Sequence, residues 1–184
     1  GVSAQLLFDG QQKLVDMKVA LSSTNYDKAL LALNEITDWN FEHVRKSAEE
    51  KWEHELQKVQ VSSSDEKLKR VFYTALYHTC IAAALFSDAD GVYKNAQGDS
   101  LKMSTGDQRY TVYSLWDTFR ALNPLFTVTQ PEKYTGMINS MLAFYDENGL
   151  LPVWDLNTWE TNTMTGYHAI PVVADAVLKN LPGI

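Results

Sequence analysis

The sequence changes once from strand-like to helical patterning and does not change back. Between Lys13 and Leu21 apolar residues alternate with polar ones, which is typical of a half-buried strand. Residues 5–8 predict another short strand, with Asp9-Gly10 as the turn. Because one or two strands do not form a stable sheet in water, we expect these strands to need partners that this chain does not supply.

Helical periodicity takes over after Ser23 and predicts helices separated by long loops. Capping boxes at Thr24/Asp27 and Ser63/Glu66 predict two of the helix starts. The expected helices cover residues 29–36, 41–59, 66–86, 115–122, 131–148 and 167–179.

Single residues sharpen several of these boundaries. Either Asp38 or Asn40 caps the second helix, Pro131 fits a first helical position, and Gly149 is a natural stop. Asn123-Pro124 is expected to interrupt or end the helix before it. The third helix is apolar over a wide face, so we expect it to be buried on much of its circumference.

Composition excludes several classes of protein. With 23 acidic and 16 basic residues the net charge is −7, which argues against a nucleic-acid-binding surface or a patch for anionic membranes. The apolar stretch 81–86 is far shorter than the roughly 20 residues of a membrane span. The single cysteine, Cys80, excludes an intrachain disulfide and a cysteine-cluster metal site.

Three segments place an indole directly before a carboxylate, a combination suited to sugars. A tryptophan face packs on the apolar C–H face of a pyranose ring, and a carboxylate accepts hydrogen bonds from vicinal hydroxyls. The pairs are Trp116-Asp117, Trp154-Asp155 and Trp159-Glu160. The alternative is that the tryptophans fill the core and that Asp117 only caps the helix nearby.

Other polar residues extend this interpretation. Arg120, one turn beyond Asp117, is expected to orient that carboxylate by a charge-assisted hydrogen bond. His168, at a helix start, is either a hydroxyl ligand or a packed or capping histidine, whereas His78 is expected to be a core histidine. Motifs of zinc proteases, serine hydrolases and phosphate-binding loops do not occur.

The segment Ser114-Leu115-Trp116-Asp117-Thr118-Phe119-Arg120-Ala121 resembles glycoside hydrolase family 92, the calcium-dependent exo-acting α-mannosidases common in gut Bacteroidetes. The resemblance continues in residues 22–52, 72–78, 86–93, 123–125, 149–154, 160–169 and 174–176. It covers nearly the whole chain, and the motifs together are specific. Thr163 stands where many relatives have cysteine, a change that we do not expect to affect sugar binding.

The resemblance implies a mainly α fold: the start of an (α/α)6 toroid, preceded by linker helices and the last strand or strands of an N-terminal β-sandwich. Residues 1–22 would end the sandwich, residues 23–61 would form the linker helices, and residues 62–184 would be the N-terminal part of the toroid catalytic domain.

The resemblance also implies that the chain is part of an exo-acting, inverting α-mannosidase, an enzyme that removes terminal mannose from glycans. Cleavage of α-1,2 linkages is expected. In such enzymes one acid protonates the leaving oxygen while a base activates water. The resemblance places Trp116, Asp117, Glu160 and His168 in the substrate pocket. It places no catalytic residue and no metal ligand in this chain, because the family's acid, base and main calcium ligands lie in motifs that this sequence lacks. Calcium is expected as cofactor of the intact enzyme, and this chain alone is expected to be inactive.

The expected partner is a mannose-containing glycan, with no nucleic acid and no membrane span. The rest of the same enzyme, or self-association, would cover exposed apolar surfaces. The family implies a periplasmic, secreted or cell-surface location in a bacterium. Two other functions stay open: a non-catalytic helical module that binds glycan or acts as a scaffold, and another (α/α)6 glycosidase or lyase.

Overall fold

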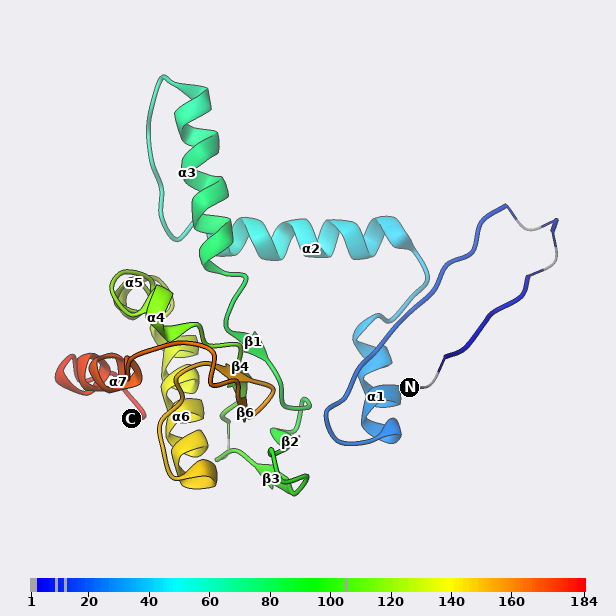
Figure 1. Cartoon of the computed structure of the whole chain (residues 1–184). Coiled ribbons are helices and arrows are strands. Elements are labelled where there is room, and N and C mark those ends of the chain that lie inside the picture. Colours follow the sequence, from blue (N-terminus) through cyan, green and yellow to red (C-terminus); the bar gives the residue numbers. More distant parts are fainter. Residues whose placement is uncertain (1–2, 9, 12, 105) are drawn as a thin grey trace.

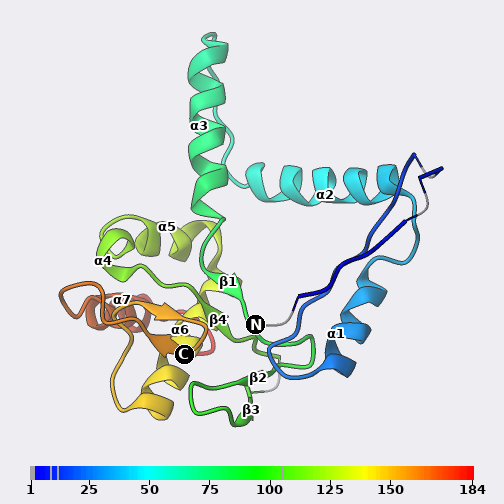
Figure 2. The same cartoon turned by 45° about the vertical axis from the view of Figure 1, so that its right-hand side comes forward.

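A computed structural model describes residues 3–8, 10–11, 13–104 and 106–184. Helices α4–α7 and short strands form a packed body, and α1–α3 extend away from it (Figures 1 and 2). The elements are α1 Tyr26–Ala32, η1 Leu33–Glu35, α2 Phe41–Leu56, α3 Glu66–Thr79, β1 Ala84–Leu85, β2 Val92–Lys94, β3 Ser100–Lys102, β4 Tyr110–Thr111, α4 Leu115–Thr118, α5 Leu122–Thr129, α6 Pro131–Asn148, β5 Asp155–Leu156, β6 Trp159–Glu160 and α7 Ala169–Leu178.

The strands of the described residues form three antiparallel pairs, β1–β4, β2–β3 and β5–β6. Each of these strands has only two or three residues, so the fold is mainly helical, as the sequence predicts. Strands β2 to β6 lie in stretches that the sequence indicated only as loops, whereas β1 falls inside the helix expected over residues 66–86. Pairing between such short strands leaves little trace in local periodicity.

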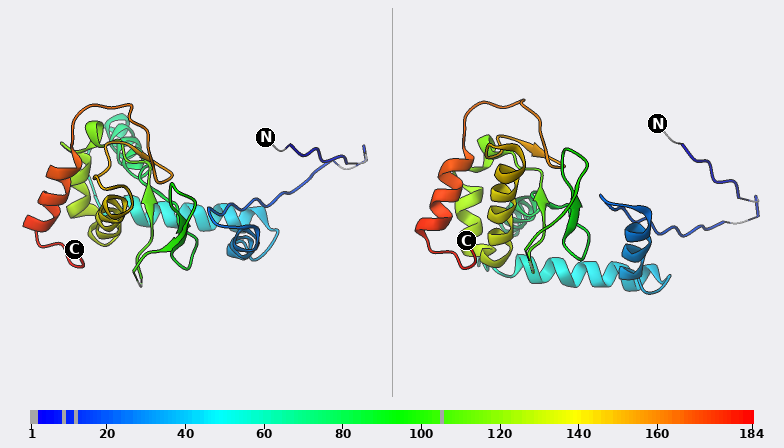
Figure 3. Two further views of the ribbon diagram at one scale, coloured as in Figure 1. Left: turned by 60° about the horizontal axis from the view of Figure 1, so that its bottom comes forward. Right: turned by 90° about the horizontal axis from the view of Figure 1, so that it is seen from below.

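The N-terminal segment differs from its prediction. Residues 3–8 and 13–21 are extended but belong to no strand ladder in the described part of the chain, and Asp9 of the expected turn lies outside the described residues. The alternating apolar side chains are exposed, with Leu14 at 79% and Leu21 at 86%. A strand requires a partner for its backbone groups, and this segment runs away from the body without one (Figure 3).

The start of α1 depends on a cap other than the predicted one. The side chain of Asn25 accepts the backbone N–H of Lys28 at 3.0 Å, so the helix begins earlier than expected. Thr24 is engaged elsewhere, because its hydroxyl and that of Ser22 both donate to the Asp88 carboxylate. These bonds attach the segment before α1 to the turn that precedes β2.

Helices α2 and α3 are exposed. Asn40 caps α2, as one of the two predictions had it, and Asp65 rather than Ser63 caps α3. Neither helix contains a buried residue, so the prediction of a largely buried third helix was wrong, and His78 is exposed rather than a core residue. The helix also ends at Thr79, because the chain beyond it turns into β1 and pairs with β4.

The core lies where α5, α6 and α7 pack together beneath the β4–α4 connection. Pro131 begins α6 and Gly149 ends it in the left-handed conformation at φ 79°, both as predicted. The core residues are Tyr113, Leu115, Phe126, Tyr134, Met137, Ile138, Met141, Ala169, Val172 and Ala176.

The expected helix over residues 115–122 is divided in two. Helix α4 ends at Thr118, and α5 begins at Leu122 with Pro124 in its first turn. Proline is tolerated there because the N–H groups of a first turn have no partner within the helix. Asn123-Pro124 therefore starts a helix instead of ending one.

A buried arginine links the strands to α6. Arg109 is fully buried, donates to the Ser140 carbonyl of α6, and pairs with Glu147 at 3.4 Å. Its guanidinium lies 5.2 Å from the ring centroid of Tyr93 in β2, and the Tyr93 hydroxyl donates to Glu147 at 2.6 Å. A buried charge is tolerated only when it is paired in this way.

Replacing Arg109 with methionine should destabilise the fold, because it leaves the Glu147 carboxylate buried without its cation. We expect a loss of about 3–5 kcal/mol in the free energy of unfolding, measured by urea denaturation. Lys179→Met is the matched control, since it breaks the exposed pair with Asp175 and should cost less than about 1 kcal/mol. Equal losses in the two variants would contradict the role given to Arg109.

Candidate functional site

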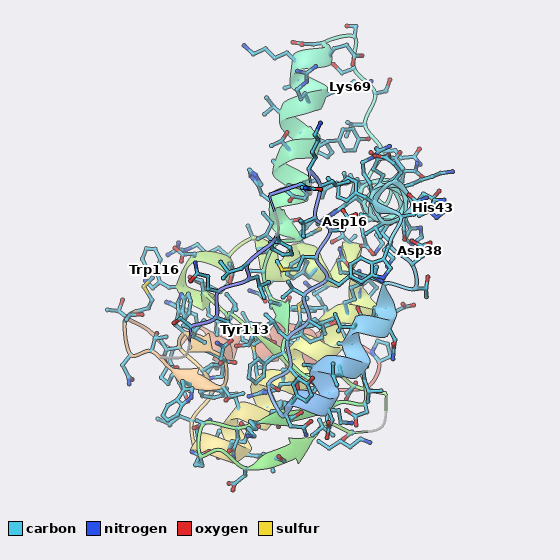
Figure 4. The ribbon with its side chains drawn as sticks, turned by 90° about the vertical axis from the view of Figure 1, so that its right-hand side faces the viewer. Asp16, Asp38, His43, Lys69, Tyr113 and Trp116 are labelled. Carbon is cyan, nitrogen blue, oxygen red and sulfur yellow. The ribbon has the colours of Figure 1, made fainter. Side chains whose placement is uncertain are left out.

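Two of the sequence-predicted site residues project from the first turn of α4. Leu115 is buried at 1% exposure and fixes the helix in the core, and the next residue, Trp116, is 38% exposed. Figure 4 shows Trp116 at the edge of the molecule and Tyr113 nearer its interior. The turn therefore presents Trp116 and Asp117 at the surface from a rigid base.

The Asp117 carboxylate has one engaged oxygen. Its Oδ2 accepts the hydroxyl of Ser114, and no hydrogen bond reaches its Oδ1 from the residues that the structure describes. The residue lies inside the first turn of α4, and Ser114 occupies the cap position. Asp117 thus offers an exposed carboxylate oxygen to a ligand.

Arg120 does not orient Asp117 as expected. Its guanidinium lies over two aromatic rings, 5.1 Å from the centroid of Trp116 and 4.8 Å from that of Phe119. The physical reason is that the planar guanidinium stacks on the ring faces, while Ser114 satisfies the carboxylate instead. Arg120 therefore supports the indole of Trp116.

Trp154 reaches α4 from the loop after α6. Its Nε1 donates to the hydroxyl of Ser114 at 2.8 Å, and that hydroxyl donates in turn to Asp117. The indole is half-buried rather than open to solvent. The sequence indicated Trp154 only as a member of one of three indole–carboxylate pairs. Ser114 and Asp117 have the spacing of a capping box, and this spacing was the sequence signal that could have linked them to each other.

Glu160 is directed at the backbone of its own hairpin. Its carboxylate accepts the N–H groups of Val153 at 2.7 Å, Trp154 at 3.1 Å and Asn162 at 3.0 Å. Hydrogen bonds to a charged group contribute roughly 1.5–3 kcal/mol, so Glu160 fixes the segment that carries the Trp154 indole. The structure thereby connects Glu160 to Asp117 through Trp154 and Ser114.

His168 lies against Phe119, the residue that directly follows α4. Its imidazole stacks on Phe119, with ring centroids 4.2 Å apart and planes inclined by 6°. It also covers Gly166, where an added Cβ would come within 2.4 Å of Nε2. This Nε2 is buried and has no hydrogen-bond partner among the described residues. His168 is thus packed, and its Nε2 is buried beside Gly166 rather than open to a ligand.

Asp155 is the buried carboxylate of the site region. Its Oδ1 accepts from the Thr111 hydroxyl at 3.2 Å and from the Thr158 N–H at 2.8 Å, and Oδ2 has no partner in the described part. Burial raises the pKa of Asp155 to about 6. Strand alternation explains why Asp155 points inward while its neighbour Trp154 turns toward α4.

Asp155 should make stability depend on pH. Its folded-state pKa of about 6 lies above the ordinary value, so between the two values the folded state binds the proton more tightly. Stability from this group is present at low pH and is lost as pH rises through about 6. Relative to Asp155→Asn, the wild type should lose about 2–3 kcal/mol between about pH 4 and pH 7, measured by urea denaturation. Parallel pH profiles would contradict this.

The described residues do not form a calcium site by themselves. Among them no group of three or more histidine, cysteine, aspartate or glutamate side chains is placed to hold a metal ion. Asp117 accepts the Ser114 hydroxyl, and Glu160 accepts backbone N–H groups. In the part of the chain described, no helix is long and apolar enough to cross a membrane.

The solved structures that resemble this chain include two mannosidases of one bacterium. An α-mannosidase of family GH92 from Bacteroides thetaiotaomicron superposes with a TM-score of 0.84 at 38% identity, over 89% of this chain and 22% of that one. The same enzyme has been solved with mannoimidazole and matches equally well, at a TM-score of 0.84. A GH92 inverting mannosidase of the same bacterium gives 0.74 at 26% identity, again over 89% and 22%.

Sequence comparisons agree. An uncharacterized secreted glycosidase of the fungus Arthroderma benhamiae is 27% identical over 172 residues, which is 91% of this chain and 18% of the relative. The chain thus spans about a fifth of the length of these relatives. Residues 28–184 match the model of the glycosyl hydrolase family 92 catalytic domain. The chain belongs to glycosyl hydrolase family 92.

Proposed function

We propose that this chain is part of an exo-acting, inverting α-mannosidase that removes terminal mannose from glycans, with a preference for α-1,2 linkages. The face around Trp116 and Asp117 forms one wall of its sugar pocket. The observation that carries this is the exposed Asp117 carboxylate, with Oδ1 unengaged by the described residues, beside a half-exposed indole on a rigid helical turn.

The geometry suits a pyranose. The indole of Trp116 offers apolar surface for ring C–H groups, and the Asp117 oxygen accepts a hydrogen bond from a hydroxyl. Arg120 supports the indole from one side. His168 is assigned to the same pocket by the resemblance; here it stacks on Phe119 directly after α4, with its Nε2 buried.

The acid and base are proposed to come from other parts of the enzyme. Inversion needs two carboxyl groups separated widely enough to admit a water molecule between base and sugar. Asp117 is assigned to sugar binding, Glu160 is held by backbone N–H groups, and Asp155 is buried, so we assign none of them as the acid or the base. This chain therefore supplies binding, and calcium, the proposed cofactor of the intact enzyme, is held elsewhere.

The domain division follows from the same proposal. Residues 1–22 end a β-sandwich, residues 23–61 form the linker helices, and residues 62–184 begin an (α/α)6 toroid. The exposed apolar side chains of the N-terminal segment and of α2 support this, since the remaining enzyme, or a second copy, would cover them. A secreted relative supports export to the periplasm, cell surface or medium.

Asp117→Ala in the complete enzyme should lower kcat/KM for an α-mannoside by about ten- to a hundredfold, because one hydrogen bond to a charged group is lost. The thermal midpoint should stay close to that of the wild type. Asp146→Ala, at an exposed position of α6, is the control and should leave kinetics unchanged. Normal turnover of Asp117→Ala with a lowered midpoint would remove Asp117 from the pocket.

The chain alone should not hydrolyse α-mannosides, because it carries no acid–base pair. Purified chain is assayed with aryl and disaccharide α-mannosides in the presence of calcium. Turnover well above that of buffer would refute the proposal that the acid and the base lie in other parts of the enzyme. Glycan binding without turnover anywhere in the complete enzyme would favour the non-catalytic alternative.

A further inference from the structure

We propose that Ser114 and Trp154 are positioning residues that aim Asp117 at the substrate. The indole N–H of Trp154 fixes the direction of the Ser114 hydroxyl, which holds Oδ2 of Asp117 and leaves Oδ1 for a sugar hydroxyl. This inference rests on the proposed function, because it specifies how the Asp117 wall of the pocket is kept in its binding geometry.

The direction of each bond follows from chemistry. An indole nitrogen only donates, so in the 2.8 Å contact with Trp154 the Ser114 oxygen must be the acceptor. The single proton of Ser114 is then free to point at the carboxylate, which accepts it. The order Trp154 to Ser114 to Asp117 is therefore the direction in which hydrogen bonds are donated, and it cannot run the other way.

We call the two hydrogen bonds from Trp154 to Ser114 and from Ser114 to Asp117 the relay. Both of its ends are fixed by the backbone. The Ser114 carbonyl accepts the N–H groups of Asp117 at 3.2 Å and Thr118 at 3.1 Å, which places its side chain at the start of α4. At the other end, the Glu160 carboxylate holds the N–H of Trp154. An exposed aspartate would otherwise rotate about its side-chain bonds, and the relay removes that freedom before substrate binds.

The relay also explains the place of Glu160 in the candidate site. Its carboxylate faces backbone donors of Val153 and Trp154, so it acts on the pocket through the indole rather than by contact with the sugar. The loop between α6 and α7 thereby sets the geometry of a residue on α4, although the two are far apart in sequence.

The experiment uses the complete enzyme with Trp154→Phe, Ser114→Ala and Ser114→Thr, each made alone and in an Asp117→Ala background. Trp154→Phe keeps an aromatic ring, although a smaller one, and removes the N–H donor. The controls are Trp39→Phe and Ser104→Ala, both at exposed positions away from α4. The readouts are kcat and KM for an α-mannoside, with the thermal midpoint of every variant.

Trp154→Phe and Ser114→Ala should each lower kcat/KM by about three- to tenfold, mainly through a higher KM, because the Asp117 side chain is no longer ordered before substrate binds. Ser114→Thr retains the hydroxyl and should restore most of the efficiency. In the Asp117→Ala background neither change should have a further effect, because the relay acts only through that carboxylate.

Three outcomes would overturn the relay. Near-normal efficiency of Trp154→Phe and Ser114→Ala, beside a clear loss in Asp117→Ala, would refute it and leave the proposed function standing. Equal losses with and without Asp117 would show a structural role instead. Normal kinetics of Asp117→Ala itself would refute the proposed function and, with it, the relay.

Discussion

The arrangement of the body depends on the buried charge of Arg109. Its guanidinium joins Glu147 and the Ser140 carbonyl of α6 to Tyr93 of β2, and a buried charge cannot be left without these partners. The next residue is fixed as well, because the Tyr110 N–H donates to the Ser140 hydroxyl at 2.8 Å. Strand β4 is thereby attached to the most deeply buried helix, and α4 begins only a few residues later.

The candidate site is a consequence of that attachment. The Asp155 carbonyl accepts the N–H groups of Val112 and Tyr113, so the β5–β6 hairpin is bound to the segment between β4 and α4. The same hairpin brings Trp154 to Ser114. Two stretches of chain remote in sequence therefore meet on one rigid support, and the exposed side chains of α4 rest on it. A candidate site built this way is organised before a ligand arrives.

Local features were predictable from sequence, and pairings were not. Pro131 and Gly149 mark helix ends through the chemistry of single residues, and the structure confirms both; of the two alternatives Asp38 and Asn40, it selects Asn40. The sequence could not show that the chain leaves α3 at Thr79 to pair with β4, since that depends on residues far along the chain. For the site, motif resemblance selected Trp116, Asp117, Glu160 and His168. The hydrogen bonds of Glu160 to backbone and the stacking of Arg120 became visible only in three dimensions.

The central claim is that the α4 face binds the terminal sugar through Asp117. The most direct measurement is a crystal structure of the complete enzyme with a mannose-like inhibitor such as mannoimidazole. The account predicts a sugar hydroxyl within hydrogen-bond distance of Asp117 Oδ1, the Ser114 hydroxyl still on Oδ2, and the ring beside Trp116. An inhibitor bound elsewhere, with Asp117 facing solvent or protein, would contradict it.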